Sequence, residues 1–298
     1  MRWMTTDLFV QSLTSGLTQG CIYALIGLGF TIIFNVTGII NFAQGEFVML
    51  GGMLSYFLTR SAGLPVVPAL LLSVLVAALV GAALYLLTIR TARRASVVSL
   101  IIITIGAAIF IRGIAGEIWG INPVSPPPFT GKHPLHVLGA TILPQALWII
   151  GITLAAAVVL HLLFSHTIIG KALRACSMNR SAASLVGIDP KIMALIAFAL
   201  AAALGALGGA VVAPLSFMSY GAGVGLGLKG FVAASMGGFR SQTAVIVGGI
   251  VLGVVEQVTI AIGWGPFKSD YKEAIALVLL LLILLVRSRK LSEEERVS

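Results

Sequence analysis

The sequence predicts an all-α protein that crosses a membrane about nine times. Of its 298 residues, 58% are hydrophobic and only 10% are charged, whereas soluble domains carry about 25% charged residues. The apolar residues form continuous runs, and a membrane helix needs about 20 of them. These runs lack the alternation of a membrane β-barrel. A polytopic helical protein, with one transmembrane domain over residues 1–298, is therefore the predicted fold class.

Nine apolar segments account for most of the chain, and their uncertain edges allow eight to ten spans. The predicted spans are residues 8–34, 41–59, 66–88, 97–119, 144–164, 192–213, 228–239, 243–263 and 272–287. The seventh is short for a span, and its surroundings are rich in glycine. The two cysteines, Cys21 and Cys176, fall in the first span and in a polar segment, so no disulfide framework is predicted.

The basic residues predict the orientation of these spans. Lys and Arg collect in cytoplasmic loops of membrane proteins. Most of the 19 Lys and Arg residues fall on one side of the nine-span layout if the C-terminal tail is cytoplasmic. The N-terminus is then outside, and a polar loop over residues 165–191 is inside. The excess of basic residues is thus interpreted as a topological signal and not as a nucleic-acid-binding surface.

This layout contains two halves of opposite orientation. The first four spans, residues 8–119, run in the reverse sense to the last four, residues 192–287, and the fifth span connects them. Such inverted repeats are typical of transporters whose pathway lies between the halves. A weak echo supports the repeat, because Gly45-Glu-Phe-Val-Met-Leu-Gly-Gly resembles Gly230-Phe-Val-Ala-Ala-Ser-Met-Gly-Gly.

Polar residues at the start of the second span are the first candidates for a pathway. Asn41, Gln44 and Glu46 surround Gly45 at the membrane border. A charge at the bilayer centre costs roughly 2.5–3.5 kcal/mol on insertion scales, so such residues tend to face a cavity or a partner. Glu46 can instead sit at a cytoplasmic helix start, where the helix dipole stabilises it. The sequence leaves both interpretations open.

A second candidate region is the glycine-rich stretch 214–230. Its proline and glycines predict a break in the membrane helix, and the free backbone groups of such breaks can bind charged ligand groups. Lys229 either pairs with a carboxylate or extends to the interface. Glu256 is either a buried clamp between helices or part of the pathway. The predicted substrate pathway comprises Asn41, Gln44, Gly45, Glu46, Tyr220, Gly225, Gly227, Lys229 and Glu256.

The polar segment 170–190 lies between two long apolar runs. Residues 171–186 predict about four helical turns, Gly187 a helix stop, and Asp189-Pro190 the start of the next span. The segment is either an interfacial helix on anionic lipid or a docking element for a soluble, energy-supplying partner. Its short mounting between two spans favours docking. The candidate docking residues are Gly170, Lys171, Arg174, Ala175, Asn179, Ala182, Leu185 and Gly187.

Several motifs together resemble one family of membrane proteins. They are Gly20-Cys-Ile-Tyr-Ala-Leu-Ile-Gly-Leu-Gly-Phe, Gly38-Ile-Ile-Asn-Phe-Ala-Gln-Gly-Glu-Phe, Arg174-Ala-Cys, Ala182-Ala-Ser-Leu-Val-Gly-Ile and Asp270-Tyr-Lys-Glu. With these motifs the chain resembles, over nearly its whole length, the permease subunits of branched-chain amino acid ABC importers, and among them the first of the two permeases. Permeases for urea, short amides, aromatic acids and sugars belong to the same wider family.

The resemblance implies a division of labour among several chains. The expected partners are a second permease subunit, two cytoplasmic ATPases and a periplasmic binding protein. The permease itself is expected to lie in the bacterial inner membrane. Segment 165–191 would be the ATPase-coupling loop. No G-x-x-x-x-G-K-[ST] phosphate loop occurs here, so the ATPases would use the ATP and Mg²⁺, and this chain is expected to bind no cofactor or metal.

The expected function is translocation of branched-chain or other apolar amino acids. One alternative is import of urea, short amides or aromatic acids by the same machinery. Another is a stand-alone secondary transporter or channel, in which Glu46 or Glu256 couples to protons. An enzyme is not expected, because the sequence offers no catalytic nucleophile, metal cluster or acid pair.

Overall fold

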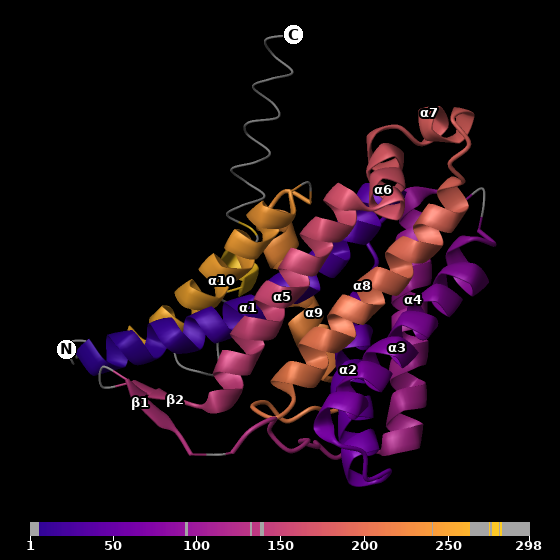
Figure 1. Ribbon diagram of the computed structural model, residues 1–298. Helices are drawn as coiled ribbons and strands as arrows, with labels where there is room; N and C mark the ends of the chain where they lie inside the picture. The colour runs from indigo at the N-terminus through magenta and orange to yellow at the C-terminus, as the bar shows by residue number, and fades with distance from the viewer. Residues whose placement is uncertain are drawn as a thin grey trace, which may run out of the picture.

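The computed structural model describes residues 6–92, 95–131, 133–137, 140–239, 241–262, 274, 276–279 and 281, and these form a helical bundle (Figure 1). The helices are α1 (Thr6–Thr37), α2 (Gln44–Arg60), α3 (Val66–Leu84), α4 (Val97–Trp119), α5 (Pro144–His166), α6 (Ile168–Met178), α7 (Arg180–Leu185), α8 (Pro190–Val212), α9 (Ala222–Met236) and α10 (Gln242–Ile262). A π-helical turn, Tyr85–Ile89, extends α3.

Six of these helices are long and apolar enough to cross a membrane: α1, α3 with its π-helical turn, α4, α5, α8 and α10. Helices α2, with 17 residues, and α9, with 15, are shorter. Each of the first eight predicted segments overlaps one of these helices. The ninth, 272–287, lies largely outside the described residues, as does the Asp270-Tyr-Lys-Glu motif.

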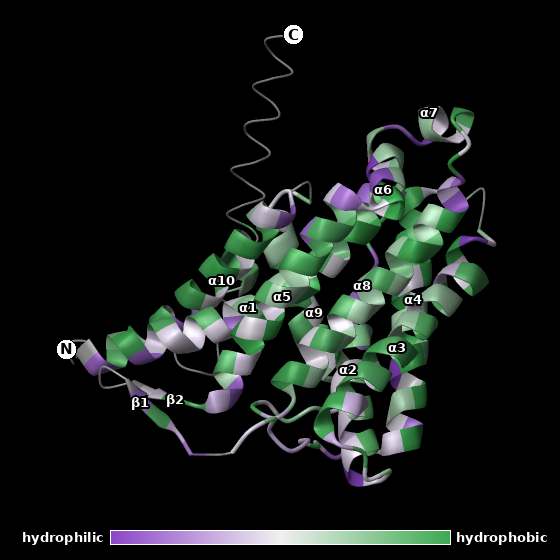
Figure 2. Cartoon of the chain, viewed as in Figure 1, coloured by the Kyte–Doolittle hydropathy of each residue, from purple (hydrophilic) through white to green (hydrophobic). Residues whose placement is uncertain are grey.

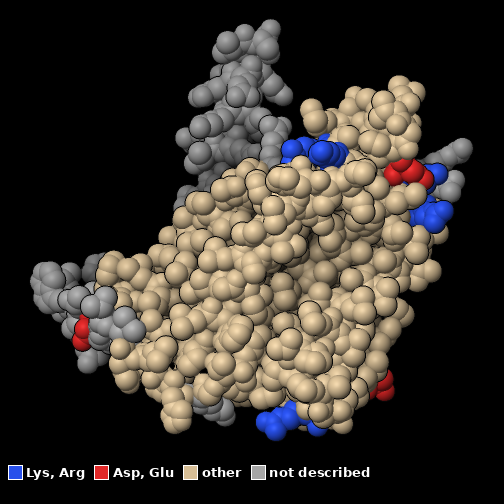
Figure 3. Space-filling view, in the orientation of Figure 1, with Lys and Arg blue, Asp and Glu red and all other residues tan. Residues whose placement is uncertain are grey.

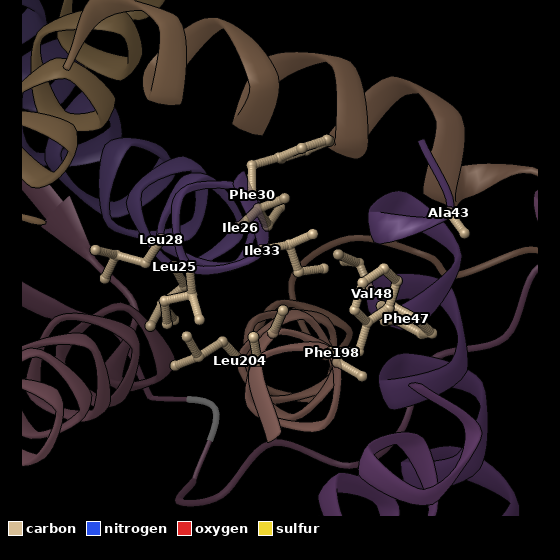
Figure 4. Close-up of a cluster of buried hydrophobic side chains, with 14 of the residues drawn as sticks. Leu25, Ile26, Leu28, Phe30, Ile33, Ala43, Phe47, Val48, Phe198 and Leu204 are labelled. Carbon is tan, nitrogen blue, oxygen red and sulfur yellow. The ribbon is translucent and has the colours of Figure 1, made fainter. Parts of the chain in front are cut away.

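Helix α1 lies at the centre of the bundle and is the most enclosed of the six long helices. It packs against α10, α8, α9 and α5. Figure 4 shows Ile33 of α1 facing Val48 of α2, and Leu25 of α1 facing Leu204 of α8. Large apolar side chains from three helices thus fill one continuous core, which fixes α2 against α1 and α8.

Both short helices follow a break in the backbone. Helix α1 ends at Thr37. The next residue, Gly38, has a φ of +69°, and its N–H donates to the Phe34 carbonyl; only a residue without Cβ adopts such a φ readily. The chain then runs without helix until Ala43. After α8, a second non-helical stretch, residues 213–221, leads into α9. Each break sends the chain back along the bundle as a short helix.

The glycine-rich stretch 214–230 is less broken than the sequence predicts. The interruption ends at residue 221, and Gly223, Gly225, Gly227 and Gly230 all lie within α9. Glycine lowers helix propensity in water. Inside a membrane bundle, however, the backbone has few other hydrogen-bond partners, and glycine lets helices approach closely.

The polar segment also differs from the single helix that the sequence predicts for residues 171–186. Asn179 adopts an extended conformation between α6 and α7, and its side chain accepts a hydrogen bond from the Ala182 N–H at 3.0 Å. Asparagine favours such capping positions, so it ends one helix and starts the next. Gly187 follows α7 with a φ of +86°, as expected for a helix stop.

The connector between α4 and α5, which lies between two of the predicted spans, contains a short hairpin. Strands β1 (Leu135–Val137) and β2 (Ala140–Ile142) pair antiparallel, and Val124 forms an isolated bridge with Met218 before α9. The hairpin lies at the opposite end of the bundle from α6 and α7 (Figure 1).

The distribution of polar side chains matches a membrane-embedded bundle. Apolar residues dominate the long helices in Figure 2. In the face shown in Figure 3, the described Lys, Arg, Asp and Glu side chains lie near the ends, with an uncharged band between them. Such a band suits the hydrocarbon core of a bilayer, with α6 and α7 beyond one of its borders.

Candidate functional site

The N-terminal turns of α2 and α9 meet inside the bundle through glycines. A Cβ on Gly45 would collide with the Gly223 carbonyl oxygen, and one on Gly227 would lie 2.8 Å from the Gly45 Cα. Such distances are far below ordinary van der Waals contact, so the crossing requires residues without side chains. The structure thus brings together two predicted pathway residues, Gly45 and Gly227.

Glu46, beside this crossing, forms an ion pair with Arg112 of α4. Both Nε and Nη2 of Arg112 donate to Glu46 Oε1, with the Nε distance at 3.2 Å. Glu46 is 1% exposed, and its second oxygen, Oε2, has no hydrogen-bond partner. The site therefore holds a charged pair with one acceptor unsatisfied, which is uncommon for a buried group.

A cavity of about 350 Å³ opens between α2, α4 and α9 at this pair. Phe30, Phe42 and Phe231 form an aromatic wall, with Phe231 centred 5.7 Å from Phe30 and 6.0 Å from Phe42. Gly45, Gly223 and Gly227 also line the cavity, as do Glu46 and Arg112. We call this space the α2–α4–α9 cavity. It combines one charged pair with a mostly apolar lining, as small-molecule sites usually do.

Asn41 and Gln44 hold the break before α2 in place. The Asn41 Oδ1 accepts from the Ala43 N–H at 3.1 Å, and the Gln44 Nε2 donates to the Ala201 carbonyl on α8 at 2.9 Å. Asn41 Nδ2 and Gln44 Oε1 are buried without partners. Neither residue lines the α2–α4–α9 cavity, and their hydrogen bonds fix the break before α2 to itself and to α8.

Lys229 and Glu256 pair with each other away from the cavity. The Lys229 Nζ donates to Glu256 Oε1 at 2.6 Å and to the Tyr23 hydroxyl at 3.1 Å, and the Tyr23 hydroxyl donates to Glu256 Oε2 at 2.9 Å. All three residues are buried between α1, α9 and α10. The sequence left open whether Lys229 pairs with a carboxylate, and it does.

The other two predicted pathway residues, Tyr220 and Gly225, do not line the cavity. Tyr220 precedes α9, and its ring lies against Gly116 of α4. Gly225 is in α9. Sequence reasoning gave no site role to Arg112. An arginine in the middle of an apolar 23-residue helix was the available signal, since buried charges in membranes need partners.

Helices α6 and α7 are fastened to the ends of the long helices. Gly170 lets α6 lie directly on α5, since a Cβ there would collide with the Leu163 carbonyl. The Arg174 Nη2 donates to the Phe164 carbonyl of α5 at 3.1 Å. Arg180 reaches the end of α1, where its Nε donates to the Val36 carbonyl at 2.7 Å. The two arginines thus bind main-chain carbonyls at the ends of α5 and α1.

The outer side of these two helices is exposed and partly apolar. Met178 is 83% exposed, and Leu185 is 88% exposed. Lys171 and Ala182 are also exposed, whereas Ala175 is half-buried. Exposed apolar residues rimmed by polar ones are typical of protein interaction sites.

A comparison with protein families assigns the chain to one of them. Residues 12–284 match the family described as branched-chain amino acid transport system, permease component. The chain is 32% identical over 298 residues to the high-affinity branched-chain amino acid transport system permease protein BraD of Pseudomonas aeruginosa, with 94% of each chain covered. It is 28% identical over 297 residues to LivH of Salmonella typhimurium, with 93% of each covered.

More distant similarities extend to other solutes and to a solved structure. The ribose import permease protein RbsC of Escherichia coli is 27% identical over 293 residues, with 94% of this chain and 87% of RbsC covered. A structure of PsaBC from Streptococcus pneumoniae in complex with Fab matches with a TM-score of 0.51 and 12% identity, covering 94% and 92% of the two chains. At this identity the match shows a shared fold.

These similarities span almost the whole chain, and they agree with the helical, membrane-length architecture. The chain belongs to the family of branched-chain amino acid transport system permease components, and it is a multi-pass ABC importer permease and not a catalytic subunit.

Proposed function

We propose that the chain is the permease subunit of an ATP-driven importer for branched-chain or other apolar amino acids in the bacterial inner membrane. The observation that carries this proposal is the 32% identity to BraD over 94% of both chains. A periplasmic binding protein would deliver the solute, a second permease would complete the pathway, and two cytoplasmic ATPases would supply energy. The α2–α4–α9 cavity, with its charged pair and aromatic wall, suits a zwitterion with an apolar side chain better than it suits ribose.

The packing supports an inverted repeat of two halves, residues 8–119 and 192–287. Helices α1, α2 and α3 correspond to α8, α9 and α10, since each triplet is a long helix, a break, a short helix and another long helix. The packing follows this correspondence: α1 packs on α10 and α9, as α8 packs on α3 and α2. Helix α2 meets α9 where the halves join. The pathway would begin there, as in other inverted-repeat transporters, and nine spans would place the N-terminus outside and the C-terminus in the cytoplasm.

Reconstitution of the importer in proteoliposomes tests the function. ATP-dependent uptake of leucine, isoleucine or valine that requires an added ATPase and binding protein is the expected result. Gradient-driven uptake by this chain alone would favour a secondary transporter instead. ATP-dependent uptake of urea, an amide, an aromatic acid or ribose, without uptake of apolar amino acids, would keep the permease role and replace the substrate.

The orientation can be tested with a cysteine at the exposed tip of α7. A Leu185→Cys variant is expected to react with a membrane-impermeant maleimide in inside-out vesicles and not in right-side-out vesicles. The native cysteines provide little background. Cys21 and Cys176 are both buried, and burial raises the pKa of the Cys176 thiol, which reduces the reactive thiolate. Labelling of Leu185→Cys from the outside would reverse the proposed topology.

The hydrogen bond from Arg180 to Val36 offers a route from the ATPase to the pathway. Val36 lies two residues before Gly38, which follows the end of α1 and begins the break leading to Asn41 and Glu46. The exposed side chains of Met178 and Leu185 would contact the ATPase. A displacement of α7 by the ATPase would then be transmitted through Arg180 to the break after α1. Arg180 is accordingly proposed as a positioning residue.

An Arg180→Gln variant is expected to bind the ATPase normally but to transport roughly tenfold more slowly. The glutamine is shorter and lacks the charge that strengthens the hydrogen bond to the Val36 carbonyl. The measurements are co-purification of the ATPase and the ratio of solute transported to ATP hydrolysed. Lys191→Gln, at an exposed position in the first turn of α8, is the control for loss of a positive charge. An unchanged ratio in Arg180→Gln would contradict the proposed route.

A further inference from the structure

The most unusual polar group in the described residues is the free carboxylate oxygen of Glu46. Glu46 Oε1 receives two hydrogen bonds from Arg112, whereas Oε2 receives none although the residue is almost wholly buried. A Cβ added to Gly223 would lie 3.1 Å from Oε2, so this oxygen points at the first turn of α9. A buried acceptor without a donor is costly, which indicates a site awaiting a ligand.

Arg112 supplies the complementary half of such a site. Its Nε and Nη2 are used by Glu46, but the guanidinium carries five N–H donors, and the Arg112 side chain is 30% exposed, against 2% for that of Glu46. Arg112 lines the α2–α4–α9 cavity, and the described residues provide no hydrogen-bond partner for its Nη1 group. The pair offers an open cationic edge next to an unsatisfied anionic oxygen.

We propose that this ion pair binds the head group of an α-amino acid as a zwitterion, a step that deepens the proposed function and depends on it. The ligand's ammonium group donates to Glu46 Oε2, and its carboxylate accepts from the free N–H groups of Arg112. The ammonium and carboxylate groups of an amino acid are attached to the same carbon, so they are as close to each other as the paired side-chain groups of Glu46 and Arg112. The head group therefore lies alongside the protein ion pair with opposite charges facing.

The remaining walls select the ligand side chain. Phe30, Phe42 and Phe231 present aromatic surface, and Ile105, Ala108 and Ile109 of α4 present aliphatic surface. A volume of about 350 Å³ is at the lower end of ligand cavities, so the ligand is a small amino acid with an apolar side chain. A sugar or urea carries no opposite charges to match the pair.

The site is closed in this conformation. The first turn of α9 covers Oε2, since Gly223 and Gly227 lie directly against Gly45. Binding of the ammonium group requires this turn to move away from α2. The close glycine contact therefore acts as the cover of the site, and its opening would accompany passage of the solute.

The test measures leucine uptake by the complete reconstituted importer in two variants. One removes both charges of the ion pair, and the other keeps the positive charge of Arg112 but changes the shape of its head group. The double variant Glu46→Gln/Arg112→Gln leaves no buried unpaired charge, which is the main cost of removing only one partner of a buried pair. Co-purification with the second permease and the ATPase is expected to be retained, which shows that the double variant still folds and assembles. Leucine uptake is expected to fall roughly tenfold or more, because charge-assisted contacts to the solute are lost. Glu117→Gln, at an exposed carboxylate of α4, is the control and should transport normally.

Near-wild-type leucine uptake by the double variant would overturn the proposal, because the pair would then serve only to hold α2 to α4. If the double variant does not assemble, Arg112→Lys decides. Lysine keeps the charge next to Glu46 but lacks the planar fork, so uptake should fall severalfold with normal assembly, and a wild-type rate would overturn the proposal. If the wild-type importer transports no amino acid, the proposed function fails first, and the zwitterion site fails with it.

Discussion

Replacing Lys229 by methionine is expected to destabilise the protein by roughly 3–5 kcal/mol, the cost of leaving one member of a buried ion pair alone. Glu256 would keep only the hydroxyl of Tyr23 as a partner, since Lys229 and Tyr23 provide its side-chain hydrogen bonds among the described residues. The loss should appear as unfolding at a lower SDS fraction in mixed micelles, with a lower yield of monodisperse protein.

The double variant Lys229→Met/Glu256→Leu is the matched control. It removes both charges and fills the space with apolar side chains, so most of the lost stability should return. Wild-type stability of Lys229→Met alone would mean that the pair does not hold α9 to α10. The same variants also address the pathway assignment from sequence. A stable double variant that fails to transport would support a place for Lys229 and Glu256 in the substrate pathway. Normal transport would mean that the pair only holds α9 to α10.

Continuous apolar runs made the long helices predictable. A helix such as α5 or α8 is apolar over more than 20 residues and begins with proline at its first turn, and both signals are local. The role of Gly187 as a helix stop also follows from a local preference for positive φ. These features depend on short stretches of chain, which is why the sequence alone contains them.

The pairing of the buried charges depends on tertiary contacts and was not predictable in the same way. Glu46 and Arg112 are 66 residues apart, and Lys229 and Glu256 are 27 apart. These four charges lie inside the predicted spans together with others such as Glu117, and more than one pairing of them balances the charge. The packing of α9 decides between them, because it turns Gly223 and Gly227 toward α2 and places Lys229 against Tyr23 and α10.

The break at Asn179 shows a different limit. Residues 171–186 have enough helix formers to predict one helix, and nothing in the periodicity marks an interruption. Asparagine is tolerated in a helix, yet its side chain caps a new helix equally well. Arg174 donates a hydrogen bond to α5, and Arg180 donates one to α1. These tertiary contacts favour two separate helices, with Asn179 as the N-cap of the second.

Gly45→Ala is expected to reduce transport at least tenfold while the protein still inserts and assembles. The new methyl group would collide with the Gly223 carbonyl oxygen, so α2 and α9 must separate at their N-terminal turns. Overpacking of this kind costs about 1–3 kcal/mol, which lowers stability without preventing folding. The larger effect falls on uptake, because the separation moves Glu46 relative to α9 and leaves the cover of the cavity unable to close. Uptake in the reconstituted importer and the SDS unfolding midpoint measure the two effects.

Gly113→Ala on α4 is the matched control for this substitution. Among the described residues, no atom lies within 4 Å of a Cβ built on Gly113, although this glycine is adjacent to Arg112 in the chain. The same chemical change should therefore leave uptake and stability near wild-type values, and the higher helix propensity of alanine should add slightly to stability. If Gly45→Ala behaved like Gly113→Ala, the contact of α2 with α9 would not be needed for transport. A pathway that opens and closes at this contact would then be excluded, whereas severe loss in Gly45→Ala alone would tie transport to the distance between two helix ends.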